Sequence, residues 1–138
     1  MILLDTDILT LYFAGHPQVT VKVQEAGEVP VTSIVSRIEI LQGRFDSVLK
    51  AEEGEKLLLA QERLAAAERS LTKFDIIRFH VGAVNEFNKL RQNKKLKKIG
   101  RRDLLIACIA LANRATLVTR NLRHFQQVPG LQLENWAD

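Results

Sequence analysis

Three acidic residues of this sequence stand where they could act together on one substrate. Asp5 directly follows the short apolar run 2–4, Glu39 lies within a predicted helix, and Asp103 directly precedes a longer apolar run. Carboxylates gathered in one place repel each other and need cations, and oxygen ligands without His or Cys favour Mg²⁺ or Mn²⁺. These ions activate water and stabilise the leaving oxygen in phosphodiester cleavage. The acids therefore indicate metal-dependent hydrolysis, provided that the fold brings them together.

The segment after Asp103 is predicted to be a buried helix. No residue from 104 to 112 is charged or polar, and a helix that is apolar all round lies in a membrane or at the centre of a domain. At about 1.5 Å per residue, this run reaches only about half way across a bilayer, so a domain core is favoured. Asp103 then lies at the edge of the core, where a carboxylate is costly to bury without a positive partner. Its alternative role is an ordinary helix cap.

The elements that must position these acids alternate along the chain. Short apolar runs predict strands at 2–4, 29–31, 76–77, 116–119 and 131–133, and amphipathic patterns predict helices at 34–41, 57–71 and 81–90. Such alternation favours a parallel sheet covered by helices on both faces. Ligands bind at the carboxyl ends of parallel strands, so Asp5, Thr119 and Asn121 are expected at one edge of the sheet.

The N-cap of the predicted helix 34–41 decides whether Glu39 lies in its first turn or further inside it. Ser33 follows a strand directly and is the better N-cap, which places Glu39 well inside the helix and beside its apolar stripe. The alternative is a capping box formed by Ser36 and Glu39. Gly43 is expected to end this helix, although a weaker helical pattern continues after it.

Two segments near the N-terminus allow more than one interpretation. Asp7 is expected to cap a helix, whereas Asp5 is harder to explain in this way because it directly continues a strand. Residues 19–23 alternate Val with polar side chains, which favours a strand, but Pro17 as a first helical residue favours a helix.

Composition and charge predict one globular domain with an anionic partner. The 138 residues are 46% hydrophobic and 26% charged, which suits a single domain from 1 to 138. The net charge is only +4, but six basic residues fall just before Asp103: Lys94, Lys95, Lys97, Lys98, Arg101 and Arg102. Such a cluster is often only a solvated loop, but beside carboxylates it suggests a polyanion.

The remaining features point to a reducing compartment. Cys108 is the only cysteine and lies in the apolar helix, so no internal disulfide is expected. We predict neither a signal peptide nor a membrane span, because Asp5 interrupts the first apolar run at once. A cytoplasmic location is therefore expected.

Motifs along nearly the whole chain resemble the PIN-domain ribonucleases, specifically the VapC-type toxins of bacterial toxin–antitoxin pairs. The similar segments are 4–7 (LDTD), 32–43 (TSIVSRIEILQG), 99–107 (IGRRDLLIA), 115–121 (ATLVTRN) with 124–125, 128–131 (VPGL) and 134–136 (ENW). Each motif alone is weak, but the ordered set is specific.

This resemblance implies a three-layer α/β/α sandwich with a mainly parallel central sheet, and it assigns residues 19–23 to a helix. It implies an endoribonuclease that uses Mg²⁺ or Mn²⁺ held by Asp5, Glu39 and Asp103, together with a homodimer and an antitoxin partner. Many family members carry a further acid where this chain has Asn121, which offers an oxygen but no charge. We expect RNA contacts from Thr6, Lys97, Lys98, Arg101, Arg102, Thr119 and Arg120.

Two other classes of protein fit parts of the pattern. A receiver-like signalling domain also gathers acids after its first strand, but it needs an Asp that ends a central strand and a Lys after a later one. Here Asp75 begins its strand and Arg120 stands where that Lys is wanted. A catalytically silent nucleic-acid-binding module would bind RNA without cleaving it. Incubating the protein with structured RNA and either Mn²⁺ or EDTA separates these classes.

Overall fold

A parallel sheet of five short strands forms the centre of the computed structural model, which describes all residues from 1 to 138. The strands are β1 (Ile2–Leu4), β2 (Val31–Ser33), β3 (Ile76–Ile77), β4 (Thr116–Val118) and β5 (Gln132–Glu134), in the order β3-β2-β1-β4-β5. Every neighbouring pair runs parallel. The predicted parallel sheet is therefore confirmed, with no antiparallel strand.

The connections between the strands are helical. They comprise α1 (Thr6–Phe13), α2 (Pro17–Glu25), α3 (Ile34–Lys50), α4 (Gly54–Leu71), α5 (Val81–Leu90), a 3₁₀ turn η1 (Lys94–Leu96), α6 (Arg101–Ala112) and the short α7 (Leu122–Phe125). No helix combines the length and the apolar character that crossing a bilayer requires.

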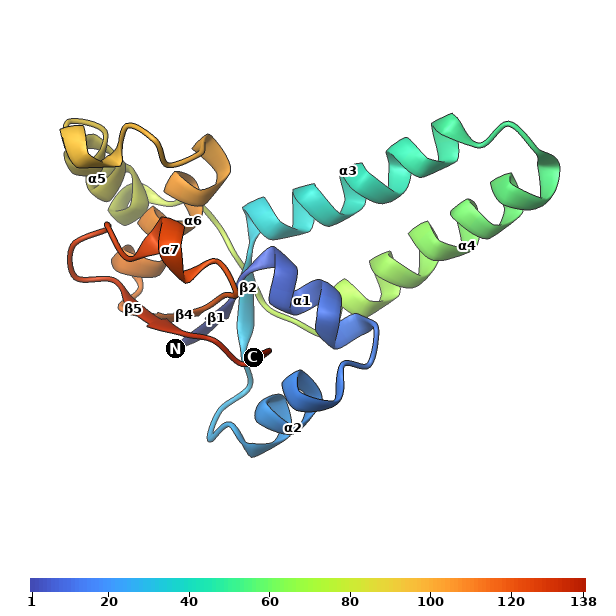
Figure 1. Ribbon diagram of the computed structural model, residues 1–138, viewed down its shortest axis with the longest axis horizontal. Coiled ribbons are helices and arrows are strands. Elements are labelled where there is room, and N and C mark those ends of the chain that lie inside the picture. Colours follow the sequence, from blue (N-terminus) through green and yellow to red (C-terminus); the bar gives the residue numbers. More distant parts are fainter.

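Helices cover both faces of the sheet, because successive strand residues point to opposite sides. Leu3 belongs to a core with residues of α5 and α6, whereas its neighbour Leu4 belongs to a second core with residues of α1, α2, α3 and α4. Leu117 and Val118 divide between the same two cores. The three-layer α/β/α sandwich is therefore confirmed (Figure 1).

Helix α6 is the predicted buried helix. Residues 106–110 are almost fully shielded from solvent, including Cys108, and burial raises the pKa of its thiol to about 11. Gly100 is the N-cap, and Asp103 lies three residues further on without capping the backbone. The interpretation of Asp103 as a helix cap is therefore wrong.

Helices α3 and α4 form an antiparallel arm that extends beyond the rest of the molecule (Figure 1). The expected end of the helix at Gly43 is wrong, because α3 runs unbroken to Lys50. A glycine costs an exposed helix only about 1 kcal/mol, and packing of α3 along α4 offsets that cost.

Residues 19–23 are helical, as the family resemblance implied and against their strand propensity. Pro17 occupies the first position of α2, and the His16 ring accepts a hydrogen bond from the Val19 amide at 3.3 Å. Val19 is completely buried against the sheet-facing core. Burial of one face of α2 therefore favours the helix, although the strand propensity of the valines and the helix-starting position of Pro17 point to different structures.

Candidate active site

The strand order places a ligand site between β1 and β4. The chain proceeds outward from β1 to β2 and β3, and then returns to the other side of β1 with β4. In open parallel sheets, ligands bind beside such a reversal, at the carboxyl ends of the strands. Asp5 directly follows β1 and Thr119 directly follows β4, and their side chains meet there. The sequence prediction that these two residues share an edge is confirmed.

Asp5 is a buried carboxylate with only neutral hydrogen-bond donors. Its side chain is held by the Thr119 hydroxyl, which donates to Oδ2 at 2.7 Å, and by the Thr6 amide, which donates to Oδ1 at 2.8 Å. Only 6% of the residue is exposed. Burial raises the pKa of Asp5 to about 7, and the charges of Asp7 and Asp103 add to this effect. The carboxylate is therefore positioned rigidly but is not neutralised by any basic side chain.

Asp7 extends the acidic group, although its position at the start of a helix predicted a capping role. Its Oδ1 accepts from the amide of Ile8 at 2.7 Å, and its Oδ2 accepts from the amide of Arg120 at 3.0 Å, which ties α1 to the loop after β4. Asp5, not Asp7, is the N-cap of α1. Burial raises the pKa of Asp7, and the charge of Asp103 raises it further.

Glu39 reaches the same edge from α3. Ser33 caps this helix by accepting from the amide of Ser36 at 3.0 Å, so Glu39 lies inside the helix, as predicted. The Thr6 hydroxyl donates to Glu39 Oε1 at 2.9 Å, and Arg102 pairs with Oε2 at 3.3 Å. Because Thr6 directly follows Asp5, this bond links α3 to the end of β1.

Asp103 lies on α6 and contacts the loop and helix that follow β4. Its Oδ2 lies 3.1 Å from His124 Nδ1, and the Asn121 amide nitrogen lies 2.6 Å from the same ring nitrogen. The other oxygen of Asp103 has no hydrogen-bond partner in the protein. Asn121 also donates its backbone amide to Thr119 Oγ1 at 2.9 Å. The structure thus brings Asn121 to the acidic edge, as its position after β4 predicted.

The acids share this edge without forming a closed ligand cage. No group of three or more His, Cys, Asp or Glu side chains is close enough to hold a metal ion in this conformation. Instead, Thr6 and Arg102 contact Glu39, and His124 contacts Asp103. The assignment of Asp5, Glu39 and Asp103 as metal ligands therefore stays a prediction.

Basic side chains lie around the acidic edge, but three of them have specific partners. Arg102 pairs with Glu39, and the guanidinium of Arg101 lies 4.9 Å from the centre of the Phe87 ring. Lys97 and Lys98 follow η1 and are exposed. Arg120 is exposed and pairs with Asp138 at 3.4 Å. The two lysines are therefore the freest of the predicted RNA contacts.

Sequence reasoning gives no site role to Asp7, Ser36 and His124. Ser36 is buried, and its hydroxyl lies 2.8 Å from the Thr6 hydroxyl, so it supports the link between Thr6 and Glu39. The three histidines of the chain lack zinc spacing, which gives no reason to select His124. Its position three residues after Asn121, at the start of a helix, was the available signal. Asp7 lies only two residues after Asp5 in the sequence. It was not selected because helix capping is a sufficient explanation for an acid at the start of a helix.

The fold and the grouping of acids agree with comparisons to known proteins. The family model described as "PIN domain" matches residues 2–131, which is almost the whole chain. A protein of Haemophilus influenzae strain R2866, named ribonuclease VapC1, is 30% identical over 139 residues and covers 98% of this chain and 97% of its own. The chain therefore belongs to the PIN-domain family and, within it, to the VapC-type proteins.

Other relatives agree with this placement. Ribonuclease VapC2 of Rickettsia felis is 43% identical, but only over 68 residues, which are 48% of this chain and 51% of that protein. The solved structure of VapBC2 from Rickettsia felis, bound to a DNA fragment from its promoter, matches 99% of both chains with a TM-score of 0.77 and 30% identity. VapBC-1 from nontypeable Haemophilus influenzae matches both chains completely, with a TM-score of 0.81, and at 24% identity it supports the fold.

Proposed function

We propose that this protein is an endoribonuclease that depends on Mg²⁺ or Mn²⁺ and acts as the toxin of a toxin–antitoxin pair. One observation carries the proposal: acids from three separate elements lie at the carboxyl edge where β1 and β4 meet, with basic side chains around them. Curated relatives bear the names ribonuclease VapC1 and tRNA(fMet)-specific endonuclease VapC, which gives the proposed reaction its class.

The chemistry of the donor set fits a hard divalent cation. Asp5, Asp7, Glu39 and Asp103 offer only carboxylate oxygens, and no thiolate is near because Cys108 is buried in α6. Oxygen donors of this kind select Mg²⁺ or Mn²⁺ over softer metals. We propose Asp5, Glu39 and Asp103 as the ligands, with Asn121 as a further oxygen donor. When bound, the ion would lower the pKa of a water molecule and stabilise charge on the leaving oxygen.

The chain's own residues would position and neutralise the reacting groups. Thr119 and the amide of Thr6 fix the orientation of the Asp5 carboxylate, and the Thr6 hydroxyl does the same for Glu39. Arg102 is exposed while it pairs with Glu39, so its guanidinium can also meet a phosphate at this edge. Preorganised groups of this kind need no rearrangement when charge develops in the transition state.

The proposed RNA path begins at the basic stretch before α6. Lys97 and Lys98 are exposed and lie in the segment that leads into the helix carrying Asp103. Lysines that contact phosphates hold a strand in place but carry little sequence information. We therefore propose that this stretch binds phosphates that flank the cut.

The proposed partners follow from the relatives. Similar structures include VapBC complexes from Rickettsia felis and Salmonella typhimurium, both with bound DNA. We propose that this chain likewise binds a cognate antitoxin and forms a homodimer.

Two alternative functions make different predictions in one assay. Purified protein is incubated with structured RNA in the presence of Mn²⁺ or of EDTA. The proposed nuclease cleaves only with Mn²⁺, whereas a silent binding module retains RNA without cleaving it. A receiver-like domain does neither, and its required acid is also misplaced, because Asp75 precedes β3 and thus lies at the amino edge of the sheet, opposite Asp5.

A further inference from the structure

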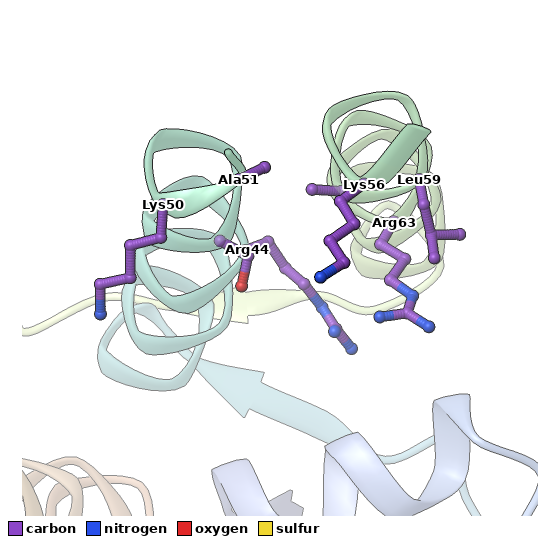
Figure 2. Close-up of a pocket in the computed structure, with 8 residues that line it drawn as sticks. Arg44, Lys50, Ala51, Lys56, Leu59 and Arg63 are labelled. Carbon is purple, nitrogen blue, oxygen red and sulfur yellow. The ribbon is translucent and has the colours of Figure 1, made fainter. Parts of the chain in front are cut away.

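The helical arm contains a cleft that is separate from the acidic edge. A hollow of about 450 Å³ lies between α3 and α4, toward the end of the arm. Its lining comprises Arg44, Ser47, Lys50, Ala51, Lys56, Leu59, Ala60 and Arg63. Figure 2 shows these side chains, and we call this hollow the arm cleft.

The arm cleft is basic because charges are sorted between faces of the arm. Residues 34–71 contain six basic and seven acidic residues, so the arm as a whole is not cationic. The lining of the cleft, however, holds four basic residues and no acidic one. Lys56 and Arg63 are seven residues apart on α4, which places them on one face of that helix. None of the seven acidic residues lines the cleft.

The spacing of small residues keeps this cleft open. Ser47 and Ala51 on α3, and Ala60 on α4, line the hollow where a tightly packed hairpin would carry larger apolar side chains. The basic side chains fill part of this space from both helices. In Figure 2, the ends of Arg44, Lys56 and Arg63 lie on the same side of the arm, whereas Lys50 lies on the outer side of α3.

The arginines of the cleft have no anionic partner within the protein. Arg44 and Arg63 make no salt bridge, whereas Lys56 has only an exposed contact with Glu53 at 3.9 Å. Like charges placed close together without counter-charges repel, so such a group gains stability from a bound anion. Arginine guanidinium groups match the geometry of phosphate through paired hydrogen bonds.

A second hollow lies between the cleft and α1. Arg44 and Arg63 line a neighbouring hollow together with Thr10 and Phe13 of α1, the helix that begins next to Asp5. Along α3, Arg44 follows Glu39 by five residues, which corresponds to about 7.5 Å of helix rise. A strand held at the carboxylates could therefore continue along the arm toward the cleft.

We propose that the arm cleft is a second RNA-phosphate site, which holds the substrate strand several nucleotides away from the bond that is cut. This inference rests on the proposed nuclease function, since that function brings RNA to Glu39. Arg44 and Arg63 would bind backbone phosphates, with Lys56 as a further point charge. The site favours RNA over an acidic peptide, because a nucleic acid strand presents a charge at every nucleotide along the path from the carboxylates.

The test compares two double variants of the full-length protein with equal loss of charge. Arg44→Gln with Arg63→Gln removes the arginines of the cleft, whereas Arg37→Gln with Arg69→Gln removes one arginine from each of the same helices outside it. Binding of a labelled 20-nucleotide single-stranded RNA is measured in EDTA over a range of salt concentrations, and gels confirm that the RNA stays intact. Thermal unfolding checks that each variant is folded.

The cleft variant should bind this RNA about tenfold more weakly at low salt, and its salt dependence should fall by about 1.4 log units, or about 0.7 for each phosphate that is no longer bound. The control variant should match the parent. With Mn²⁺, the cleft variant should cleave the long RNA more slowly but cleave a tetranucleotide at the parent's rate, because the short substrate does not reach the cleft.

Three results would overturn the proposal. Equal weakening by both double variants would show a general effect of charge, and no weakening by either would place the RNA elsewhere. Loss of affinity for a polyglutamate peptide, with RNA binding unchanged, would assign the cleft to an acidic protein partner. A parent that binds RNA through the cleft but cleaves nothing with Mn²⁺ would refute the nuclease function and leave the phosphate site standing.

Discussion

At the scale of single residues, Asp5 carries an energetic cost that its hydrogen bonds only partly offset. The side chain is buried beside Asp7, and its bonds come from a hydroxyl and an amide instead of a cation. Charged groups are rarely buried in this way unless the cost serves a purpose. The proposed cation site at this edge would supply that purpose, and predictions on pH and metal dependence follow from this proposal.

We predict that the metal-free protein becomes less stable as pH rises from about 4 to about 7. Burial raises the pKa of Asp5 from 3.8 to about 7 and also raises that of Asp7. In this window the folded state binds more protons than the unfolded state, so the free energy of unfolding falls with rising pH, by at most about 1.4 kcal/mol per pH unit for each group. Denaturant titrations in EDTA at several pH values measure this slope.

The matched variant for this prediction is Asp5→Asn, which keeps the shape of the side chain but cannot ionise. Its stability should change less with pH than that of the parent, with a smaller dependence left from Asp7. An unchanged pH dependence in this variant would show that Asp5 ionises in the folded protein as freely as in the unfolded chain.

Asn121 leads to a second prediction at this scale. Its amide contacts His124, which in turn contacts Asp103, and it does not cap α7 with its side chain. With only three proposed carboxylate ligands, we expect at most one tightly bound Mn²⁺ in the free protein and a second only with RNA. Asn121→Asp adds charge at the same edge and should tighten binding of the second Mn²⁺, measured by calorimetric titration.

Two results would remove Asn121 from the metal site. One is a parent protein that already binds two Mn²⁺ ions tightly, and the other is an Asn121→Asp variant that binds the second ion no better than the parent. The role of Asn121 would then be limited to its backbone bond with Thr119, in a turn position that Asn fills readily.

The roles of single residues were predictable where they depend on a position directly after a strand. Asp5 and Thr119 directly follow buried strands, so parallel topology alone places them together. His124 and Ser36 were not predictable in this way, because their roles depend on which side chains lie across from them in space. The contact of Arg102 with Glu39 likewise joins residues 63 positions apart.

At the scale of elements, the 3₁₀ turn η1 and the following segment present lysines to solvent next to α6. We predict that Lys97→Gln with Lys98→Gln weakens RNA binding similarly for all sequences. The salt dependence of binding should fall by about 0.7 log units for each phosphate of a single strand that the variant no longer binds. Fluorescence binding titrations at several salt concentrations measure this slope, and an unaltered slope would place the RNA away from this stretch.

Element boundaries show what local sequence can and cannot decide. The start of α3 at Ser33 followed from a capping residue after a strand, which is a local signal. Its length did not, because the contacts of α3 with α4 outweigh the glycine at position 43. In α2, burial of Val19 outweighs the strand propensity of three valines. Long-range packing therefore explains the end of α3 and the helical structure of α2, which the local sequence pattern could not predict.

At the scale of the whole molecule, the proposed toxin function predicts an effect on cell growth. Cells that express this chain without an antitoxin should stop growing, because uncontrolled RNA cleavage blocks translation. The Asp5→Asn form, expressed to the same level, should permit normal growth. Growth curves with matched protein amounts in the soluble fraction provide the measurement. Healthy growth with abundant parent protein would argue against a toxin role but not against nuclease chemistry.

The central claim is that the carboxylates at the meeting of β1 and β4 perform metal-dependent RNA cleavage. The most direct measurement is the single-turnover rate of RNA cleavage with Mn²⁺ for the parent, Asp5→Asn and Asp103→Asn. Asp75→Asn serves as the control, since Asp75 is an exposed acid at the opposite edge of the sheet. Thermal unfolding of each variant detects any loss of stability.

We predict that Asp5→Asn and Asp103→Asn each slow cleavage by at least about a hundredfold, because each removes a full charge from the proposed metal site. The Asp75→Asn variant should cleave RNA at the parent's rate. If either site variant cleaved RNA as fast as the parent, with at most about 1 kcal/mol of stability lost as for a helix cap, the acids would be structural and the proposed active site would be wrong.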